Sequence, residues 1–160
     1  MQEKINDIFK YSKNKKRLLE LEESNKFVFH GSYGDLNILH PKQGYNLNKN
    51  TNVMEKDGDP AVFATNFSEI AIFRSLINKQ NIKGPSCSYF GIKKGHLYFA
   101  ATQNLIDAAK DKTGKIYVLD KNKFQPRNNI EVVSYQSVSP IEAVEVDFND
   151  LPQNIEILQR

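Results

Sequence analysis

The chain has 160 residues, of which 39% are hydrophobic and 26% are charged, as expected for one globular domain and not for a disordered chain. Lysine and arginine number 22 against 19 acidic residues, and the net charge of +3 is too small to indicate nucleic-acid binding by itself. The single cysteine, Cys87, excludes an internal disulfide and a cysteine-based zinc site, and we interpret it as a buried, unreactive thiol.

The N-terminus is acidic where a signal peptide would be basic, and no run of about 18 apolar residues occurs. We therefore expect a cytoplasmic protein without a membrane partner. We expect a single domain over residues 1–160, with an N-terminal helical segment at 1–25 and a core at 26–150. The first segment has apolar residues at helical spacing and predicts one or two helices. Its dense basic cluster at 13–17 is either a solvated helix face or a surface for phosphate or a partner.

Residues 26–30 form a short aromatic and β-branched run that ends at Gly31, which predicts a strand entering a turn. Residues 40–60 contain glycine, proline and many asparagines and predict a long loop, a feature that is often mobile or functional. Residues 61–65 predict a second strand. Asn66 is expected to cap a following helix, with Glu69 reaching back to the free N–H groups.

The remainder of the chain is mostly β-rich. Glycine, proline and lysine clusters separate five predicted strands, at 86–92, 96–102, 115–119, 130–138 and 141–148. One brief helical pattern lies between Gln103 and Lys112. Because strands and helices cluster and do not alternate, the sequence predicts an α+β fold with an antiparallel or mixed sheet.

Two residues at strand ends are candidates for chemistry. His30 ends its strand next to Gly31, which allows a ligand to approach the backbone, although a histidine bonded to a neighbouring group is the commoner case at a strand end. Alternation puts Glu131 on one strand face with Val133 and Tyr135, so this carboxylate either faces water at a sheet edge or serves a function. The sequence has no dinucleotide-binding glycine motif, Walker A loop, nucleophile elbow or His-Glu-x-x-His motif.

Taken together and in order, three segments resemble the ADP-ribosyltransferase superfamily, in particular the branch of diphtheria toxin and the poly(ADP-ribose) polymerases. Phe29-His-Gly-Ser32 matches the His-Gly-Ser or His-Gly-Thr of that family's first core strand. Val62-Phe-Ala-Thr65 and the helix that ends at Phe73 are similar to its Tyr-Phe-Ala strand and following helix. Asn129-Ile-Glu-Val-Val-Ser-Tyr135 is similar to the late strand that holds the catalytic glutamate. The matched span runs from about residue 27 to 148.

The resemblance implies split, mostly antiparallel sheets around a nucleotide cleft, with N-terminal helices. It implies a mono-ADP-ribosyltransferase that takes NAD as its substrate, needs no metal and modifies a protein or nucleic acid. Its catalytic residues would be Glu131, which stabilises an oxocarbenium-like state, and His30, which holds the adenosine ribose. The loop at 40–60 would close over the cofactor. The cofactor-binding residues implied are His30, Gly31, Ser32, Phe63, Ala71 and Phe73, with Gly31 binding the carboxamide and Phe73 stacking on the nicotinamide.

Three positions depart from the family pattern. Val62 stands at the family's central tyrosine, and Ile70 stands where many members have a serine that binds the carboxamide. Asn129 stands where arginine-specific relatives have a glutamate, which argues against an arginine acceptor. Three explanations of the missing contacts stay open. Neighbouring residues such as Tyr33, Tyr45 or Ser68 supply them, or the affinity for NAD is low, or the protein binds a related nucleotide without transferring it.

Two other interpretations stay open. In the first, the chain is a catalytically inactive module of the same fold that binds NAD or ADP-ribose. In the second, it is a structural protein in which His30 and Glu131 are only strand-end residues. The enzyme and the binding module both require His30, Phe73 and Glu131 around one cleft. Placement of His30 and Glu131 on opposite sides of the sheet would favour the structural interpretation.

Overall fold

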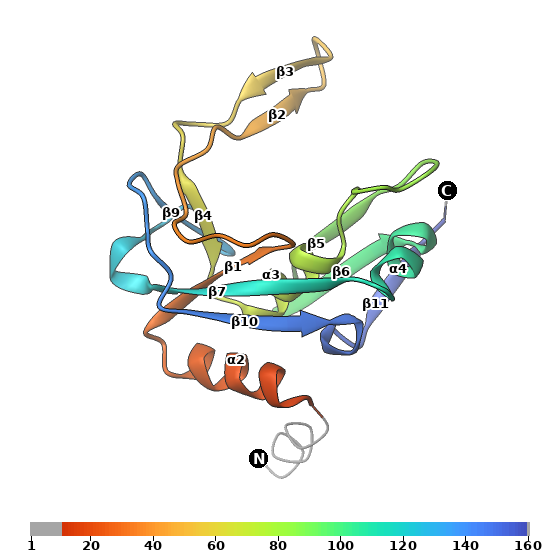
Figure 1. Ribbon diagram of the computed structural model, residues 1–160. Coiled ribbons are helices and arrows are strands. Elements are labelled where there is room, and N and C mark those ends of the chain that lie inside the picture. Colours follow the sequence, from red (N-terminus) through yellow and green to blue (C-terminus); the bar gives the residue numbers. More distant parts are fainter. Residues whose placement is uncertain (1–10, 160) are drawn as a thin grey trace.

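The N-terminal helix packs under the main sheet of the protein, whose computed structural model describes residues 11–159 (Figure 1). Helix α2 (Lys13–Glu23) buries Leu18 and Leu21, and Ser12 caps it by accepting a hydrogen bond from the Lys15 backbone N–H. One helix of the expected N-terminal segment is therefore confirmed, whereas the helical pattern over residues 1–10 lies outside the described residues. No helix between residues 11 and 159 is long and apolar enough to cross a membrane.

Two sheets and a separate hairpin make up the β-structure, and the α+β prediction with mostly antiparallel sheets is confirmed. The large sheet has the order β10-β7-β1-β4-β9-β8, and the small sheet has the order β11-β6-β5. In the large sheet the strands are β10 (Glu142–Asp147), β7 (Thr113–Asp120), β1 (Phe27–Ser32), β4 (Val62–Thr65), β9 (Glu131–Ser134) and β8 (Gln125–Pro126). In the small sheet they are β11 (Ile155–Leu158), β6 (His96–Thr102) and β5 (Ser88–Lys93), and β11 runs parallel to β6.

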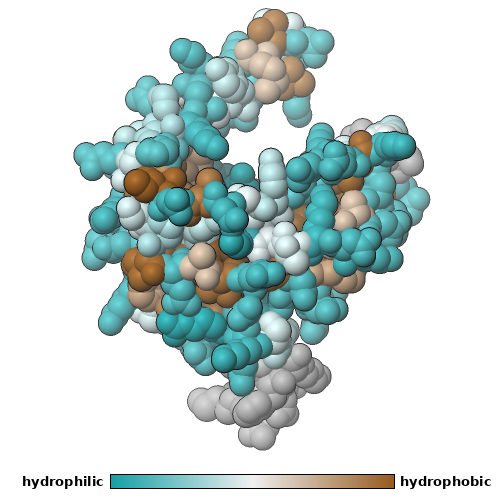
Figure 2. Space-filling view, viewed as in Figure 1, coloured by the Kyte–Doolittle hydropathy of each residue, from teal (hydrophilic) through white to brown (hydrophobic). Residues whose placement is uncertain are grey.

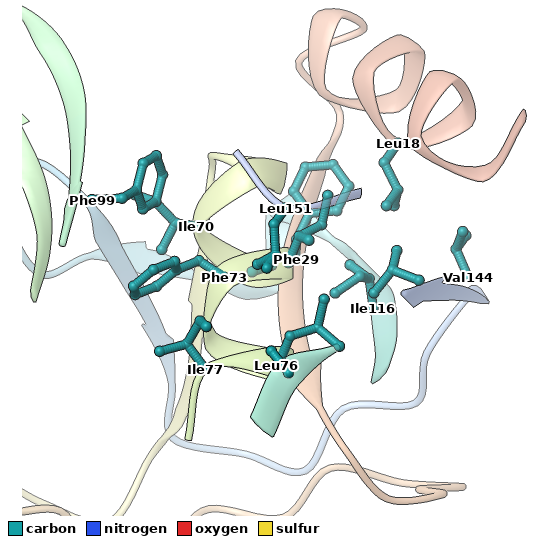
Figure 3. Close-up of a cluster of buried hydrophobic side chains, with 14 of the residues drawn as sticks. Leu18, Phe29, Ile70, Phe73, Leu76, Ile77, Phe99, Ile116, Val144 and Leu151 are labelled. Carbon is teal, nitrogen blue, oxygen red and sulfur yellow. The ribbon is translucent and has the colours of Figure 1, made fainter. Parts of the chain in front are cut away.

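Helix α3 (Ser68–Leu76) lies between the two sheets and forms the centre of the main core (Figure 3). Its apolar residues pack against β1 and β7 on one side and β6 on the other, where Phe73 meets Phe99 at 5.1 Å between ring centroids. Helix α4 (Gln103–Ala109) follows β6 and adds Leu105 to the same core. Two glycines permit this close packing of α3.

Those two glycines lie on β1 and β7. A Cβ atom at Gly31 would come 2.0 Å from the Ala71 carbonyl oxygen, and one at Gly114 would come 2.4 Å from the Ser75 hydroxyl. The helix backbone therefore rests directly on the sheet. Gly31 has a packing role here that is different from the ligand approach considered from the sequence.

A second, smaller core covers the opposite face of the large sheet. Its buried residues include Val28, Tyr117 and Val132, and the chain after β1 closes over them. The backbones of Leu39 and Val138 exchange two hydrogen bonds at 2.9 Å, and the Tyr117 hydroxyl donates to the Gly34 carbonyl at 2.7 Å. This segment takes the place of a covering helix.

The prediction of an unstructured loop at 40–60 is wrong, because a hairpin occupies its centre. Strands β2 (Tyr45–Asn48) and β3 (Val53–Lys56) pair with each other and with no other strand of residues 11–159, and they project from the body of the protein (Figure 1). The Asn52 backbone N–H donates to Asn48 at 2.7 Å, and Asn52 adopts a positive φ of 56°. Asparagine tolerates this conformation, so the polar run that suggested a loop is the turn of a hairpin.

The predicted cap of the second helix is also wrong. Helix α3 begins at Ser68, and the Glu22 carboxylate of α2 accepts hydrogen bonds from the Ser68 backbone N–H at 2.6 Å and hydroxyl at 2.8 Å. Asn66 makes no cap, and its side-chain oxygen is buried without a partner among the described residues. Glu69 instead pairs with Lys15 at 3.2 Å. The cap comes from a distant segment, which local sequence does not indicate.

The basic cluster at 13–17 is divided by the packing of α2. Lys15 is buried, where it pairs with Glu69 and lies 4.5 Å from the centre of the Tyr11 ring, so it is no part of a solvated face. Arg17 pairs with Glu142 of β10 at 3.0 Å. Cys87 also differs from its prediction, because it is half-buried and directly precedes β5.

Candidate functional site

The large sheet opens between β1 and β4, and His30 lies at this opening. The two strands are paired at Phe29 and Thr65 alone, whereas β1 and β7 are paired along six residues of each strand. The His30 ring spans the gap, with its Nδ1 atom 2.7 Å from the Phe63 carbonyl oxygen. A side chain thus makes the bond to β4 that a neighbouring backbone would otherwise provide.

The chemistry of the His30 ring follows from that bond. A carbonyl oxygen only accepts, so Nδ1 carries the proton, and the neutral ring presents Nε2 as an acceptor. Burial lowers the pKa of His30 below its ordinary value of 6.5, the bond to Phe63 opposes this shift, and the charges of Arg74 and Lys42 add to it. At pH 7 the ring is therefore neutral and suited to accept a hydrogen bond from a hydroxyl group.

A mostly apolar cavity of about 250 Å³ adjoins His30. Leu36, Leu39 and Val62 belong to its apolar wall, and His40 and Lys42 bring polar and cationic groups to it. The His40 ring is held by a contact of 2.8 Å between its Nδ1 and the Ser137 hydroxyl. The cavity therefore combines an apolar interior with basic groups.

A second, smaller cavity of about 70 Å³ lies on the other side of Phe63 and has acidic groups. Ala61 and Phe63 line both cavities, so the two adjoin along β4. Asp57 and Asp59, from the base of the hairpin, bring carboxylates to the second cavity, and Arg127 and Tyr135 complete it. On the surface, the molecule is hollowed between the hairpin and the small sheet (Figure 2).

Glu131 begins β9 and pairs with Arg127 of this second cavity, although it lines neither of the two cavities itself. A tight turn fixes its position. The Asn128 side-chain oxygen accepts hydrogen bonds from the backbone N–H groups of Ile130 at 2.9 Å and Glu131 at 2.8 Å. The Arg127 N–H donates to the Glu131 carbonyl at 2.9 Å. The Glu131 carboxylate lies 3.5 Å from the Arg127 guanidinium, which in turn lies over the Phe63 ring at 5.1 Å.

The side chains of His30 and Glu131 start from opposite faces of the large sheet. Phe29, Thr65 and Glu131 are in register, and His30 follows Phe29, so strand alternation starts the two candidate side chains on opposite faces. The His30 ring nevertheless turns into the opening and reaches Phe63, whose ring contacts Arg127. Contacts with the Phe63 backbone and ring connect His30 to Arg127, which pairs with Glu131. The opposite faces of His30 and Glu131 favour the structural interpretation, and Phe73, buried in the core, does not share a cleft with them.

The other residues assigned to cofactor binding divide between core and surface. Phe73 is 1% exposed and packs against Phe99 in the main core (Figure 3). Its ring also contacts the Phe90 ring, and Ala71 is equally buried against Gly31. These side chains are not available to stack on a ligand in this structure. The Ser32 hydroxyl is half-buried and accepts a hydrogen bond from the Gly34 N–H at 3.2 Å.

The positions that depart from the family pattern, and their suggested replacements, are also placed. Ile70 is buried in the main core, and Val62 is buried in the smaller core. The Ser68 hydroxyl is bound to Glu22 and does not replace a lost contact. The remaining candidates are accessible, since Tyr33 is 62% and Tyr45 is 54% exposed.

Arg127, Asp57 and Lys42 were missed by the sequence reasoning. Arg127 stands four residues before Glu131, and the Asn128-Asn129 pair that follows it is a turn signal that could have drawn attention to it. Asp57 and Lys42 lie in the stretch that was interpreted as a loop, and only the fold brings them to β4.

Comparisons with protein families, with curated proteins and with solved structures gave no match for this chain. Among residues 11–159, no group of three or more histidine, cysteine, aspartate or glutamate side chains is arranged to hold a metal ion.

Proposed function

We propose that this protein is an NAD-dependent mono-ADP-ribosyltransferase whose cofactor lies across the opening between β1 and β4. The observation that carries the proposal is a pair of adjoining cavities that share Phe63, one lined by Lys42 and two histidines and the other by Asp57 and Asp59 together with Arg127. NAD is a dinucleotide with an anionic diphosphate and a cationic nicotinamide ring. Basic groups at one cavity and carboxylates at the other match that distribution of charge.

The apolar cavity suits the adenosine half of the ligand. Ligand cavities for drug-sized molecules are about 300–1,000 Å³, so a space of about 250 Å³ fits a nucleoside better than a whole dinucleotide. The neutral His30 ring offers Nε2 as an acceptor for a ribose hydroxyl. Lys42, next to this cavity, would contact the diphosphate.

Glu131 would act at the nicotinamide ribose. When the bond between ribose C1′ and the ring nitrogen breaks, the electron pair leaves with nicotinamide, which becomes neutral, and positive charge develops on the ribose. The Glu131 carboxylate would stabilise that charge and hold a ribose hydroxyl. A nucleophile of the acceptor then attacks C1′ and loses its proton, and ADP-ribose is transferred.

Release of nicotinamide from NAD tests this function. We expect the wild-type protein to release nicotinamide and Glu131→Gln to lose this activity by about two orders of magnitude or more, because the variant keeps the shape of the side chain and removes its charge. Glu145→Gln, an exposed carboxylate of β10, is the matched control and should keep full activity. Equal release by wild type and Glu131→Gln would contradict the proposal.

A second candidate function is the binding of NAD or ADP-ribose without transfer. The ion pair between Arg127 and Glu131 favours it, because a cation beside the carboxylate opposes the stabilisation of a second positive charge. The burial of Phe73 favours it as well, since the expected stacking partner of nicotinamide is absent from the surface. Calorimetry would then detect binding of NAD by a protein that releases no nicotinamide.

A further inference from the structure

Arg127 is held between two carboxylates that come from different parts of the chain. Its guanidinium pairs with Asp57 at the base of the hairpin through Nη2 and with Glu131 through Nη1, and its face covers the Phe63 ring. All three ion-pairing side chains are largely shielded, with 25% to 30% of each exposed. Solvent therefore screens these charges less than it would at an open surface.

The two ion pairs are unequal. The hydrogen bond to Asp57 is the main cause that raises the pKa of Arg127, while Glu131 adds a smaller effect through its charge. The Arg127 guanidinium is thus bound mainly by Asp57, and its contact with Glu131 at 3.5 Å is the looser one.

Different segments of the chain hold the arginine and its two carboxylates in place. Arg127 and Glu131 belong to the same turn, which backbone bonds and Asn128 hold in place. Asp57 follows β3, and its backbone N–H donates to the Gly44 carbonyl at 2.8 Å where the hairpin closes. The hairpin therefore supplies the counter-charge for an arginine that is fixed beside Glu131.

We propose that Asp57 is a positioning residue for Glu131, because it holds the Arg127 guanidinium and keeps it from closing on the Glu131 carboxylate. Without Asp57, the nearest anion for Arg127 is Glu131. A closer pair would then offset the negative charge that acts on the cationic end of the ligand. This inference rests on the proposed function, and it gives the hairpin a role in setting the charge of the site.

Four proteins test the inference by steady-state nicotinamide release: wild type, Asp57→Asn, Arg127→Gln and the double variant. We expect Asp57→Asn to lower kcat about tenfold or more, with a smaller change in KM for NAD. The double variant should recover most of the kcat lost in Asp57→Asn, because the arginine that moved onto Glu131 is gone. Asp57→Glu should restore activity, and Glu55→Gln on the same hairpin is the matched control.

An ion pair that only stabilises the fold predicts a different pattern. Asp57→Asn, Arg127→Gln and the double variant would then lose the same activity, in proportion to their loss of thermal stability. A double variant no faster than Asp57→Asn would overturn the inference. Thermal unfolding of all four proteins shows whether each variant is folded.

A second measurement keeps this inference separate from the proposed function. If wild type releases no nicotinamide, the proposed function fails, and the same four proteins are compared by calorimetry with NAD and with ADP-ribose. We then expect Asp57→Asn to weaken binding of NAD, which has the cationic ring, about tenfold more than binding of ADP-ribose, and the double variant to recover. Equal effects on both ligands, or no binding of either, would overturn the inference.

Discussion

Helix α3 and the hairpin β2–β3 both adjoin the central strands of the large sheet, but they are held there in opposite ways. The helix touches both sheets, rests on glycine backbones and buries nearly all of its side chains. Seven of the eight hairpin strand residues are exposed, and within the described part of the chain each of its strands pairs with the other alone. Hydrophobic packing fixes the helix, whereas the base of the hairpin is held mainly by polar contacts, among them the pair of Asp57 with Arg127.

The difference separates the residues of the family-like segments into two groups. Gly31, Ala71 and Phe73 belong to the helix region and build the scaffold. His30 and Glu131 belong to the region of the opening, where polar groups meet. A match to a motif therefore does not say which residues touch a ligand, because some of them only allow strand and helix to pack closely.

The largest effect on stability should come from Phe73, because its removal disrupts the packing around helix α3. Phe73→Ala leaves a cavity between Phe90 and Phe99, and we expect a loss of about 3–5 kcal/mol in the free energy of unfolding. Phe63→Ala, at a half-buried ring in the opening, should cost less than half as much. Denaturant unfolding measures both, and equal losses would show that the two regions are packed alike.

A smaller effect is expected at Gly31. Its new methyl group in Gly31→Ala would meet the Ala71 carbonyl at 2.0 Å, so helix and strand must separate, at a cost of about 1–3 kcal/mol. Gly34→Ala is the matched control, because nothing lies within 4 Å of its Cβ position, and it should change stability by less than about 0.5 kcal/mol. Thermal or denaturant unfolding of the two variants gives the difference. A stable Gly31→Ala protein would mean that the helix does not rest on β1.

The smallest effect concerns the pH dependence of the opening. Because burial lowers the pKa of His30, the stability due to its neutral ring is fully present above the unfolded value of about 6.5 and is lost as pH falls through the folded value. Wild type should therefore lose more stability than His30→Gln between pH 7.5 and pH 5. Unfolding measured at both pH values tests this. An NMR titration of the ring that gives a pKa of 6.5 or higher would refute it.

Local patterns predicted the strands and helices where the signal was strong. The strand at 96–102 was predicted with its observed bounds, and the aromatic run before Gly31 is β1. The hairpin was missed because its alternation is short and lies among asparagines that are equally typical of loops. Strand β11 was missed because its four residues are a strand only through parallel pairing with β6, more than fifty positions away.

The candidate site was only partly predictable for the same reason. His30 and Glu131 attracted attention as polar residues at strand ends, and the fold links them through Phe63 and Arg127. Neither the pairing of Arg127 with Asp57 nor the use of Glu22 as a helix cap could be predicted, because each joins segments that are distant in sequence. The sequence around Phe73 does not distinguish a ring that stacks on a ligand from a ring that packs in the core.

The sequence by itself determined the α+β composition, the positions of most strands and the absence of a disulfide, because these depend on local periodicity and on residue counts. The tertiary structure alone decided where the sheet opens, which charges surround Glu131 and which motif residues are buried. Contacts between distant segments depend on how helix α3 packs between two sheets, and that packing is set by the whole core and not by any one segment.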